Sequence, residues 1–327
     1  MECLISQPAS THIVNRFMLE EGATTTRRTQ AQRFSPAKSS SPLSLFLLSK
    51  LSLAVVVLFS GLTYGTMVPI PSLLSPPIIF VLADNIQGTL GDDTLNGTPK
   101  ADTINGFEGN DIIYGKAGND VLDGSKGDDQ IYGGDGNDKI KDGNDGPVGY
   151  ESDYGNKVYG GSGNDNINLG IDYERDDYYY VYGEDGVDYI NVVSNADIHG
   201  GPKDDTIYCT GHECIVYGDE GNDKIHVEAH DAESSVSGGS GNDKIYFKGG
   251  GGYQSGDNGN DYIFVDGGGG DLQGGKGDDI LEATGAANYY NGGPGADNFK
   301  CSSGPGDVVE DYNPAEGDVV SSNCETV

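Results

Sequence analysis

Apolar side chains recur at nine-residue intervals through a mostly polar region that begins near residue 84. In a three-residue strand, the middle side chain points to the opposite face from its two neighbours. The pattern therefore predicts very short strands that each bury one apolar residue in a thin core. The residues that set this interval in six consecutive nonapeptides are Leu95, Ile104, Ile113, Leu122, Ile131 and Ile140.

The same nonapeptides carry Gly at the first position and Asp at the sixth, beginning at Gly88. Eight further copies follow at wider spacing, and the fourth residue of all fourteen copies is Gly except at Lys100 and Lys203. Composition bias alone does not make Gly, Asp and an apolar residue agree in fourteen units, so the chain contains a true repeat. The aspartates at the sixth position are Asp93, Asp102, Asp111, Asp120, Asp129, Asp138, Asp165, Asp188, Asp205, Asp223, Asp243, Asp261, Asp279 and Asp297.

The loop G-x-x-G-x-D of each unit has the composition of a cation-binding loop. Glycine accepts backbone angles and close approaches that other residues avoid, so such loops can turn carbonyl oxygens toward a shared point. Loops stacked at the strand spacing of about 4.7 Å could supply these carbonyls, and one carboxylate each, to a single ion. Ca²⁺ accepts roughly six to eight oxygen ligands, whereas Mg²⁺ demands a tighter octahedron and keeps its water. The sequence therefore predicts calcium sites at the fourteen aspartates.

These repeats resemble the haemolysin-type (repeats-in-toxin) calcium-binding family, whose unit is G-G-x-G-x-D-x-U-x with an apolar residue at U. The resemblance covers residues 88–300. It implies an all-β fold, a parallel β-roll or right-handed β-solenoid with about 18 residues per turn. It also implies Ca²⁺ as the cofactor and the fourteen aspartates as its metal ligands. We predict three parts, a leader at 1–83, the calcium-binding roll at 84–306 and a C-terminal cap at 307–327.

The spacing between the repeat aspartates changes after Asp138, from nine residues to between 17 and 27 residues. Each of these longer intervals is about one full turn, so we expect one edge of the roll to keep its ion sites and the other edge to lose them. We assign the aspartates from Asp165 to Asp297 to the edge of Asp93, Asp111 and Asp129. The opposite edge then carries Asp102, Asp120 and Asp138.

One ion for each neighbouring pair of aspartates on an edge gives about eleven Ca²⁺ in this scheme. We expect no ion where Pro147 and Asn156 occupy the sixth position of two irregular units. The longer segments 169–182 and 227–237 are expected to bulge from the edge without ions.

The leader contains an apolar stretch at 51–70, long enough to cross a bilayer as a helix. It could be an export signal that is removed or an N-terminal membrane anchor that is kept. Basic residues precede it, with Lys50 the last, so either alternative places the acidic part outside the cytoplasm, secreted or at the cell surface.

The acidity of the chain fits bound cations. Its formal net charge is −33, and residues 84–327 hold 13 basic and 49 acidic residues, a net charge of −36. Such a field repels phosphate, so nucleic acid is excluded as a partner. The low apolar content and the 53 glycines also disfavour the class of enzymes with a conventional large apolar core.

We make separate predictions for disulfide pairing of the cysteines and for metal binding by the histidines. Cys209 and Cys301 lie about five turns apart, too far for a disulfide. The expected pairs are therefore Cys209–Cys214 and Cys301–Cys324, with free thiols or metal ligation as alternatives. The histidines are spread over several turns without an H-E-x-x-H spacing, which favours solvated surface positions.

Tyrosine is frequent at the ninth position of the unit, as in Tyr114 and Tyr132. An outward-facing tyrosine ladder that stabilises adjacent strands accounts for this. The alternative is a sugar- or surface-binding face centred on Tyr178, Tyr179 and Tyr180 in a bulge.

Taken together, these features predict an exported module that folds when it binds Ca²⁺, with a structural or adhesive role and no catalytic residue. Its expected partners, beyond calcium ions, are a cell-surface glycan or another surface protein. Two alternatives stay open. One is a polysaccharide-modifying enzyme with its site near 169–182, and the other is a calcium buffer or surface-layer component.

Overall fold

The computed structural model describes residues 84–143, 155–170, 178–229 and 234–327. They all belong to one of the two units into which the chain divides, Leu73–Val327. The leader, with its predicted export signal or anchor, and Pro147 lie outside the described residues. Within the described part of the chain, no helix is long and apolar enough to span a membrane.

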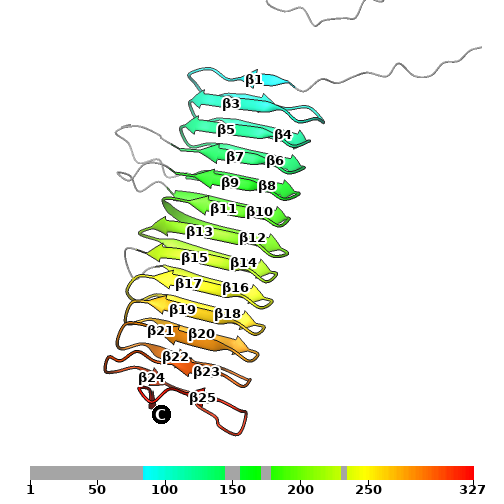
Figure 1. Cartoon of the computed structure of the whole chain (residues 1–327). Coiled ribbons are helices and arrows are strands. Elements are labelled where there is room, and N and C mark those ends of the chain that lie inside the picture. Colours follow the sequence, from blue (N-terminus) through cyan, green and yellow to red (C-terminus); the bar gives the residue numbers. More distant parts are fainter. Residues whose placement is uncertain (1–83, 144–154, 171–177, 230–233) are drawn as a thin grey trace, which may run out of the picture. The chain divides into compact units, whose positions relative to one another are not determined.

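The described residues form two parallel sheets of 13 strands each, one from the odd-numbered and one from the even-numbered strands (Figure 1). The first sheet, sheet A, contains β1 (Asn85–Gln87), β3 (Thr103–Glu108), β5 (Val121–Lys126), β7 (Lys139–Asp142), β9 (Asn166–Leu169), β11 (Tyr189–Val192), β13 (Thr206–Gly211), β15 (Lys224–Ala229), β17 (Lys244–Lys248), β19 (Tyr262–Asp266), β21 (Ile280–Ala283), β23 (Asn298–Lys300) and β25 (Val319–Val320). Sheet B contains β2 (Thr94–Asn96), β4 (Ile112–Ala117), β6 (Gln130–Asp135), β8 (Asn156–Ser162), β10 (Tyr178–Asp185), β12 (Asn195–Pro202), β14 (Cys214–Glu220), β16 (Ser235–Ser240), β18 (Tyr253–Asn258), β20 (Asp271–Lys276), β22 (Tyr289–Asn291), β24 (Val308–Val309) and β26 (Glu325–Thr326).

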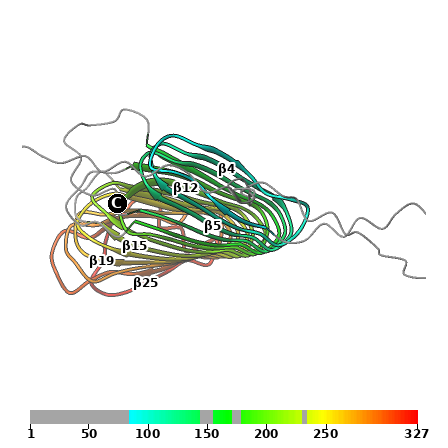
Figure 2. The same ribbon diagram turned by 90° about the horizontal axis from the view of Figure 1, so that it is seen from above.

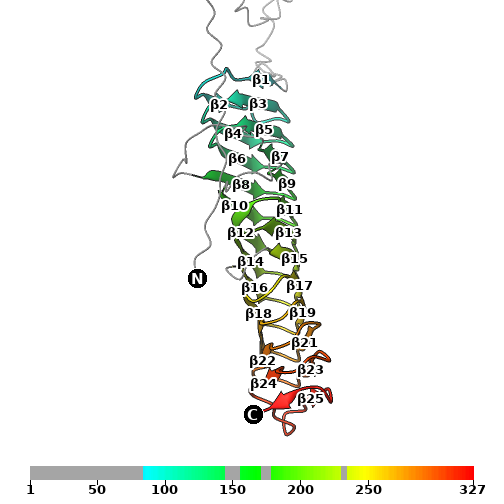
Figure 3. The same cartoon turned by 90° about the vertical axis from the view of Figure 1, so that its left-hand side faces the viewer.

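The chain alternates between the two sheets, so one strand from each makes a turn of a parallel β-solenoid (Figures 1 and 3). Seen along the stack, successive turns overlie one another with a progressive shift (Figure 2). Most paired residues are 18 positions apart, as in Ile104 and Leu122. The repeat unit of nine residues therefore makes half a turn, which confirms the predicted all-β parallel roll with about 18 residues per turn. The roll has about 12 turns.

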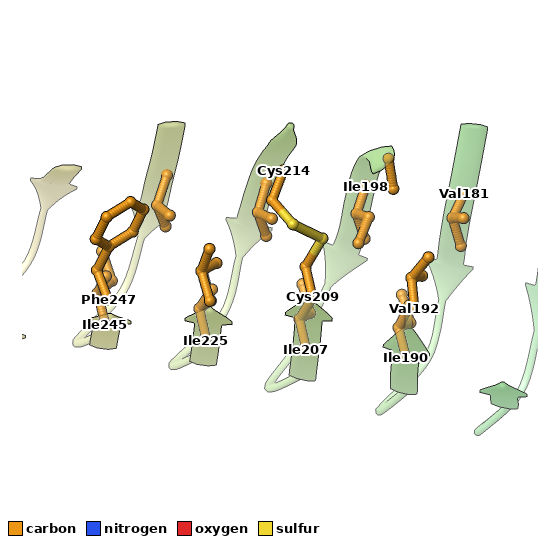
Figure 4. Packing of buried hydrophobic residues seen from close by; sticks show 14 of the residues in the cluster. Val181, Ile190, Val192, Ile198, Ile207, Cys209, Cys214, Ile225, Ile245 and Phe247 are labelled. Carbon is orange, nitrogen blue, oxygen red and sulfur yellow. A yellow bond between two sulfur atoms is a disulfide. The ribbon is translucent and has the colours of Figure 1, made fainter. Parts of the chain in front are cut away.

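The core lies between the two sheets and consists of the apolar residue at the eighth position of each unit. Ile104, Ile113 and Leu122 are fully buried there. From β9 onward, most strands of sheet A add a second inward residue two positions later, such as Val192 after Ile190 (Figure 4). Burying one such side chain contributes about 1.5–3 kcal/mol, so the core grows stronger in this half but stays one residue layer thick on each side.

The predicted tyrosine ladder is confirmed on the outer face of sheet B. Six rings stack with centroids 4.6–5.2 Å apart, and the fifth of them is His199, between Tyr182 and Tyr217. A shorter stack on sheet A places His226 between Tyr208 and Tyr246. The expectation of solvated surface histidines is therefore wrong for these two, because each replaces a tyrosine at an outward position of the repeat.

The alternative of a binding face centred on Tyr178, Tyr179 and Tyr180 in a bulge is wrong in its placement of these three residues. These residues begin β10, and strand alternation turns Tyr179 into the core, where it is 1% exposed. Only Tyr178 and Tyr180 remain on the outer face, where their rings contact each other.

Both predicted disulfides are present. Cys209–Cys214 joins β13 to β14 across the connection between the sheets, with both residues buried (Figure 4). Cys301–Cys324 joins the end of β23 to the segment before β26. The region predicted as a cap continues the solenoid, because β24 pairs with β22 and β25 pairs with β23.

Candidate metal sites

The repeat aspartates line two edges of the solenoid. Three of them, Asp93, Asp111 and Asp129, precede strands of sheet B and form what we call the short row. The other eleven precede strands of sheet A and form the long row: Asp102, Asp120, Asp138, Asp165, Asp188, Asp205, Asp223, Asp243, Asp261, Asp279 and Asp297.

The prediction that Asp188 to Asp297 share one edge is confirmed, but their assignment to the edge of Asp93 is wrong. Asp165 follows Asp138 directly, because the backbone N–H of Asp138 donates to Oδ1 of Asp165 at 2.7 Å. The interval of 27 residues between them is one turn, since β7 pairs directly with β9 and joins residues 27 positions apart, as in Ile140 and Ile167. Of the bulges predicted at 169–182 and 227–237, residues 171–177 and 230–233 lie outside the described residues, and the residues on either side belong to β9 and β10 and to β15 and β16 or adjoin them.

A continuous hydrogen-bond ladder links the carboxylates of the long row. The backbone N–H of each aspartate from Asp102 to Asp279 donates to Oδ1 of the next aspartate at 2.7–2.8 Å. All eleven side chains are buried, with at most 3% exposure. One oxygen of each carboxylate is therefore fixed by the neighbouring turn.

The second oxygen, Oδ2, has no hydrogen-bond partner in eleven of the fourteen repeat aspartates. A buried acceptor without a partner costs about 1–3 kcal/mol, and a charged one costs more. A protein does not repeat such a cost without a ligand that offsets it, so these oxygens point to a cation. They belong to Asp111, Asp120, Asp138, Asp165, Asp188, Asp205, Asp223, Asp243, Asp261, Asp279 and Asp297.

A backbone carbonyl of the next turn approaches ten of these eleven oxygens, all but that of Asp297, beside the first glycine of the loop. A Cβ added to Gly160 would lie 2.6 Å from Oδ2 of Asp165 and 2.6 Å from the carbonyl oxygen of Gly183, so the two oxygens are at most 5.2 Å apart. Two ligands of one Ca²⁺ can be up to about 5 Å apart, because each bond is about 2.3–2.6 Å long. The carboxylate and the carbonyl therefore fit a shared calcium ion.

The same pair of oxygens recurs in ten loops, nine along the long row and one on the short row. In each, both oxygens lie less than 3.0 Å from the position of a Cβ on the first glycine. These glycines are Gly106, Gly115, Gly133, Gly160, Gly183, Gly200, Gly218, Gly238, Gly256 and Gly274. Beside Gly97 and Gly88 the carboxylate oxygen is farther away, at 3.0 Å and 3.1 Å. Any other residue there would place a methylene group between the oxygens, which explains why the first position is always Gly.

Burial raises the pKa of eleven carboxyls in the rows, and neighbouring carboxylates add to this in most of them. Without a cation, they therefore favour the protonated form more than an ordinary aspartate does. The pKa is raised to about 8 for Asp188, Asp223 and Asp261, to about 7 for Asp138 and Asp205, to about 6 for Asp243, Asp279 and Asp297, and in direction for Asp111, Asp120 and Asp165.

Asp102 differs from the rest of the long row. Burial acts to raise its pKa, but hydrogen bonds from the N–H of Asp84 and from Thr98, together with the charge of Lys116, outweigh burial and lower it. Oδ2 of Asp102 accepts bonds from the N–H and the hydroxyl of Thr98, and Oδ2 of Asp93 accepts the same bonds from Thr89. The structure therefore separates these two predicted ligands from the others.

Asp318, which ends the long row, is not among the residues predicted from the sequence. Oδ1 of Asp318 accepts the N–H of Asp297 at 3.0 Å, and its Oδ2 accepts the N–H of Asn313 at 2.7 Å. The signal was present, because Asp318 precedes Val320 by two residues as each repeat aspartate precedes its apolar residue. On the short row, Oδ1 of Asn156 accepts the N–H of Asp129 at 2.6 Å, so an uncharged side chain continues the ladder there.

No group of three or more His, Cys, Asp or Glu side chains that could hold a metal is found among the residues that the structure describes. This agrees with sites that take carboxylates from the loops and the remaining ligands from backbone carbonyls. It also leaves the histidines outside any multi-residue metal cluster in that part of the chain.

Comparison with known proteins identifies these loops. The model of the RTX calcium-binding nonapeptide repeat matches four segments of the chain, residues 87–122, 114–141, 152–172 and 234–253. All but a few of the matched residues lie within the described solenoid, and they include loops from both rows. Six loops of the long row lie outside the matched segments, those of Asp188, Asp205, Asp223, Asp261, Asp279 and Asp297. No curated protein and no solved structure matches the chain.

Replacing the first glycine of one loop should remove one ion site. In the Gly200→Ala variant, the new Cβ would stand 2.6 Å from Oδ2 of Asp205 and 2.8 Å from the carbonyl of Gly218. We expect one fewer bound Ca²⁺ and a loss of about 2 kcal/mol or more in the free energy of unfolding, measured by urea titration in saturating Ca²⁺. Gly250→Ala is the matched control, because its nearest atom is 3.7 Å away, and equal effects of the two substitutions would contradict this site.

The ion-free chain should be more stable in mild acid. Carboxyls with a raised pKa bind protons more tightly in the folded than in the unfolded chain, so stability is lost as pH rises through about 6–8. We therefore expect the β-sheet signal in circular dichroism, recorded with chelator, to increase as pH is lowered from 8 to 5. A signal that stays constant or decreases over this range would show that the carboxyls are not desolvated as described.

Proposed function

We propose that this chain, which contains RTX calcium-binding repeats, is an exported protein whose β-roll folds on binding Ca²⁺ and then acts as a structural or adhesive module at the cell surface. The observation that carries the proposal is the set of eleven buried carboxylate oxygens without hydrogen-bond partners. The geometry of the loops supports about ten ions, nine along the long row and one on the short row.

The charge balance supports coupled folding and binding. Residues 84–327 carry a net charge of −36, and ten Ca²⁺ would bring twenty positive charges and leave −16. Without ions, the carboxylates repel one another across neighbouring turns and the many glycines lose backbone entropy on folding. The free energy of ion binding then becomes free energy of folding.

Calcium concentration would confine the folded form to the outside of the cell. Extracellular modules of this kind bind Ca²⁺ with dissociation constants of about 0.1–1 mM, far above the affinity range of cytosolic buffers. The chain would therefore stay unfolded during export and fold outside. The proposal assigns no catalytic residue, because every repeat aspartate belongs to the rows.

The outer face of sheet A supports an adhesive role. A groove there is lined by the stacked rings of Tyr208, His226 and Tyr246, together with Phe264 and the polar side chain of Asn191. The groove combines aromatic carbon with hydrogen-bonding groups, as binding sites for small polar molecules commonly do. We propose that a neutral polysaccharide binds in this groove, since the acidity of the protein disfavours an anionic one.

The folding proposal predicts a transition that depends on calcium. We expect the circular-dichroism spectrum to show a disordered chain in excess chelator and β-structure in millimolar Ca²⁺, with Mg²⁺ unable to replace it. Identical spectra with chelator and with Ca²⁺ would contradict the proposal.

The adhesive proposal predicts retention on immobilised neutral polysaccharides in millimolar Ca²⁺. The Tyr246→Ala variant, which removes a ring from the groove, should be retained several-fold less than the unmodified chain. Tyr114→Ala serves as the control, because Tyr114 ends the separate stack on sheet B. Equal retention of both variants would rule out the groove, and release of sugar products would favour the polysaccharide-modifying enzyme instead.

A further inference from the structure

The first interval of the long row differs from all those that follow it. It lies between the loop Gly97–Asp102 and the loop Gly115–Asp120. In the next ten aspartates of this row, Oδ2 has no hydrogen-bond partner. Oδ2 of Asp102, in contrast, accepts two hydrogen bonds from Thr98, one from the N–H at 2.5 Å and one from the hydroxyl at 2.9 Å. The carboxylate that would face an ion is thus already satisfied.

A lysine side chain from the next turn places its ammonium group in the same interval. The ammonium group of Lys116 donates to the carbonyl oxygen of Gly97 at 2.8 Å. Lys116 is the second residue of its loop, and no other repeat loop has a basic residue at this position. The corresponding residues along the rest of the long row are Gly134, Gly161, Glu184, Gly201, Asp219, Gly239, Asp257, Gly275 and Gly293.

The backbone of the Thr98 loop follows this difference. The second residue has a positive φ, between +67° and +113°, in twelve repeat loops, including those in which it is Phe107, Lys116 or Ser125. Thr89 and Thr98 are not among these residues of positive φ. The two loops with threonine at the second position therefore have a different backbone conformation, in which the N–H of the threonine donates to the carboxylate of the same loop.

We propose that Lys116 and Thr98 take the place of Ca²⁺ in the first interval of the long row, so that this turn is held without an ion. The inference rests on the proposed binding of Ca²⁺ to the other intervals. The ammonium group supplies positive charge and hydrogen-bond donors to the oxygens of the interval, and the threonine supplies the donors that Oδ2 of Asp102 requires.

At the opposite end of the long row, the last carboxylate also has a hydrogen-bond partner within the protein, since Oδ2 of Asp318 accepts a bond from the N–H of Asn313. The row thus has internal partners at both ends and unpartnered oxygens only between them. The first turn offers a calcium-independent surface on which the ion-filled turns can stack, as the end of a solenoid requires.

Opening the interval should create a calcium site. The double variant Thr98→Gly, Lys116→Gly restores the glycine that most other loops have at the second position. We expect it to bind one Ca²⁺ more than the unmodified chain, counted by native mass spectrometry and by equilibrium dialysis in saturating Ca²⁺. The matched control is Ser125→Gly, Lys126→Gly, because Ser125 already has a positive φ and Lys126 pairs with the exposed Glu108; its ion count should not change.

Introducing a lysine at the second position of another loop of the long row should remove the calcium site there. Glu184 is the second residue of its loop and its charge acts on Asp165 of the preceding turn, as that of Lys116 acts on Asp102. We expect Glu184→Lys to bind one Ca²⁺ fewer, whereas Glu184→Gln removes the acid without adding an ammonium group and should keep the full count.

The results separate this inference from the proposed function. An unmodified chain that binds no Ca²⁺ would overturn the proposed function itself. If the unmodified chain binds Ca²⁺ but the Thr98→Gly, Lys116→Gly variant gains no ion, the inference is wrong. Should that variant fail to give a β-sheet spectrum, the comparison of Glu184→Lys with Glu184→Gln decides, and equal ion counts for the two would overturn the inference.

Discussion

The mutual repulsion of a buried row of carboxylates governs this structure. Eleven aspartates follow one another at one edge of the solenoid, one per turn, and each is almost fully buried. Strand pairing fixes successive turns at about 4.7 Å, so the carboxylates cannot move apart without breaking the sheets. The hydrogen-bond ladder satisfies one oxygen of each, and in ten of them the other oxygen has no hydrogen-bond partner, so a cation between the turns would neutralise it.

The remaining features of the sequence follow from this constraint. The first glycine of each loop leaves room for a carboxylate and a carbonyl oxygen to approach each other, as beside Gly160. The core is only one apolar residue deep on each side in the first turns, too thin to offset the repulsion by burial alone. The disulfides strengthen the later turns and the aromatic stacks run from β4 onward, but neither acts on the carboxylates.

Much of this arrangement could be predicted from the sequence because its period is local. The nine-residue repeat specifies the strands, the parallel solenoid and the aspartates, and the short distance between Cys209 and Cys214 along the chain specifies a disulfide. The edge assignment after Asp138 could not be predicted in this way. A lengthened connection between two strands and an additional half-turn give similar spacings, and only the bond from Asp138 to Asp165 distinguishes them. The hydrogen bonds that satisfy Asp102 could not be predicted either. They depend on the backbone conformation of Thr98, and the bond from Lys116 of the next turn to the carbonyl of Gly97 is not part of the repeat pattern.

The most direct test of the account is the location of calcium in crystals of the chain grown with Ca²⁺, by anomalous scattering at a long X-ray wavelength. The account predicts a line of anomalous peaks beside the first glycines of the long row, from Gly115 to Gly274, each between two successive turns. Peaks confined to the protein surface, or a folded solenoid without peaks along this row, would contradict it.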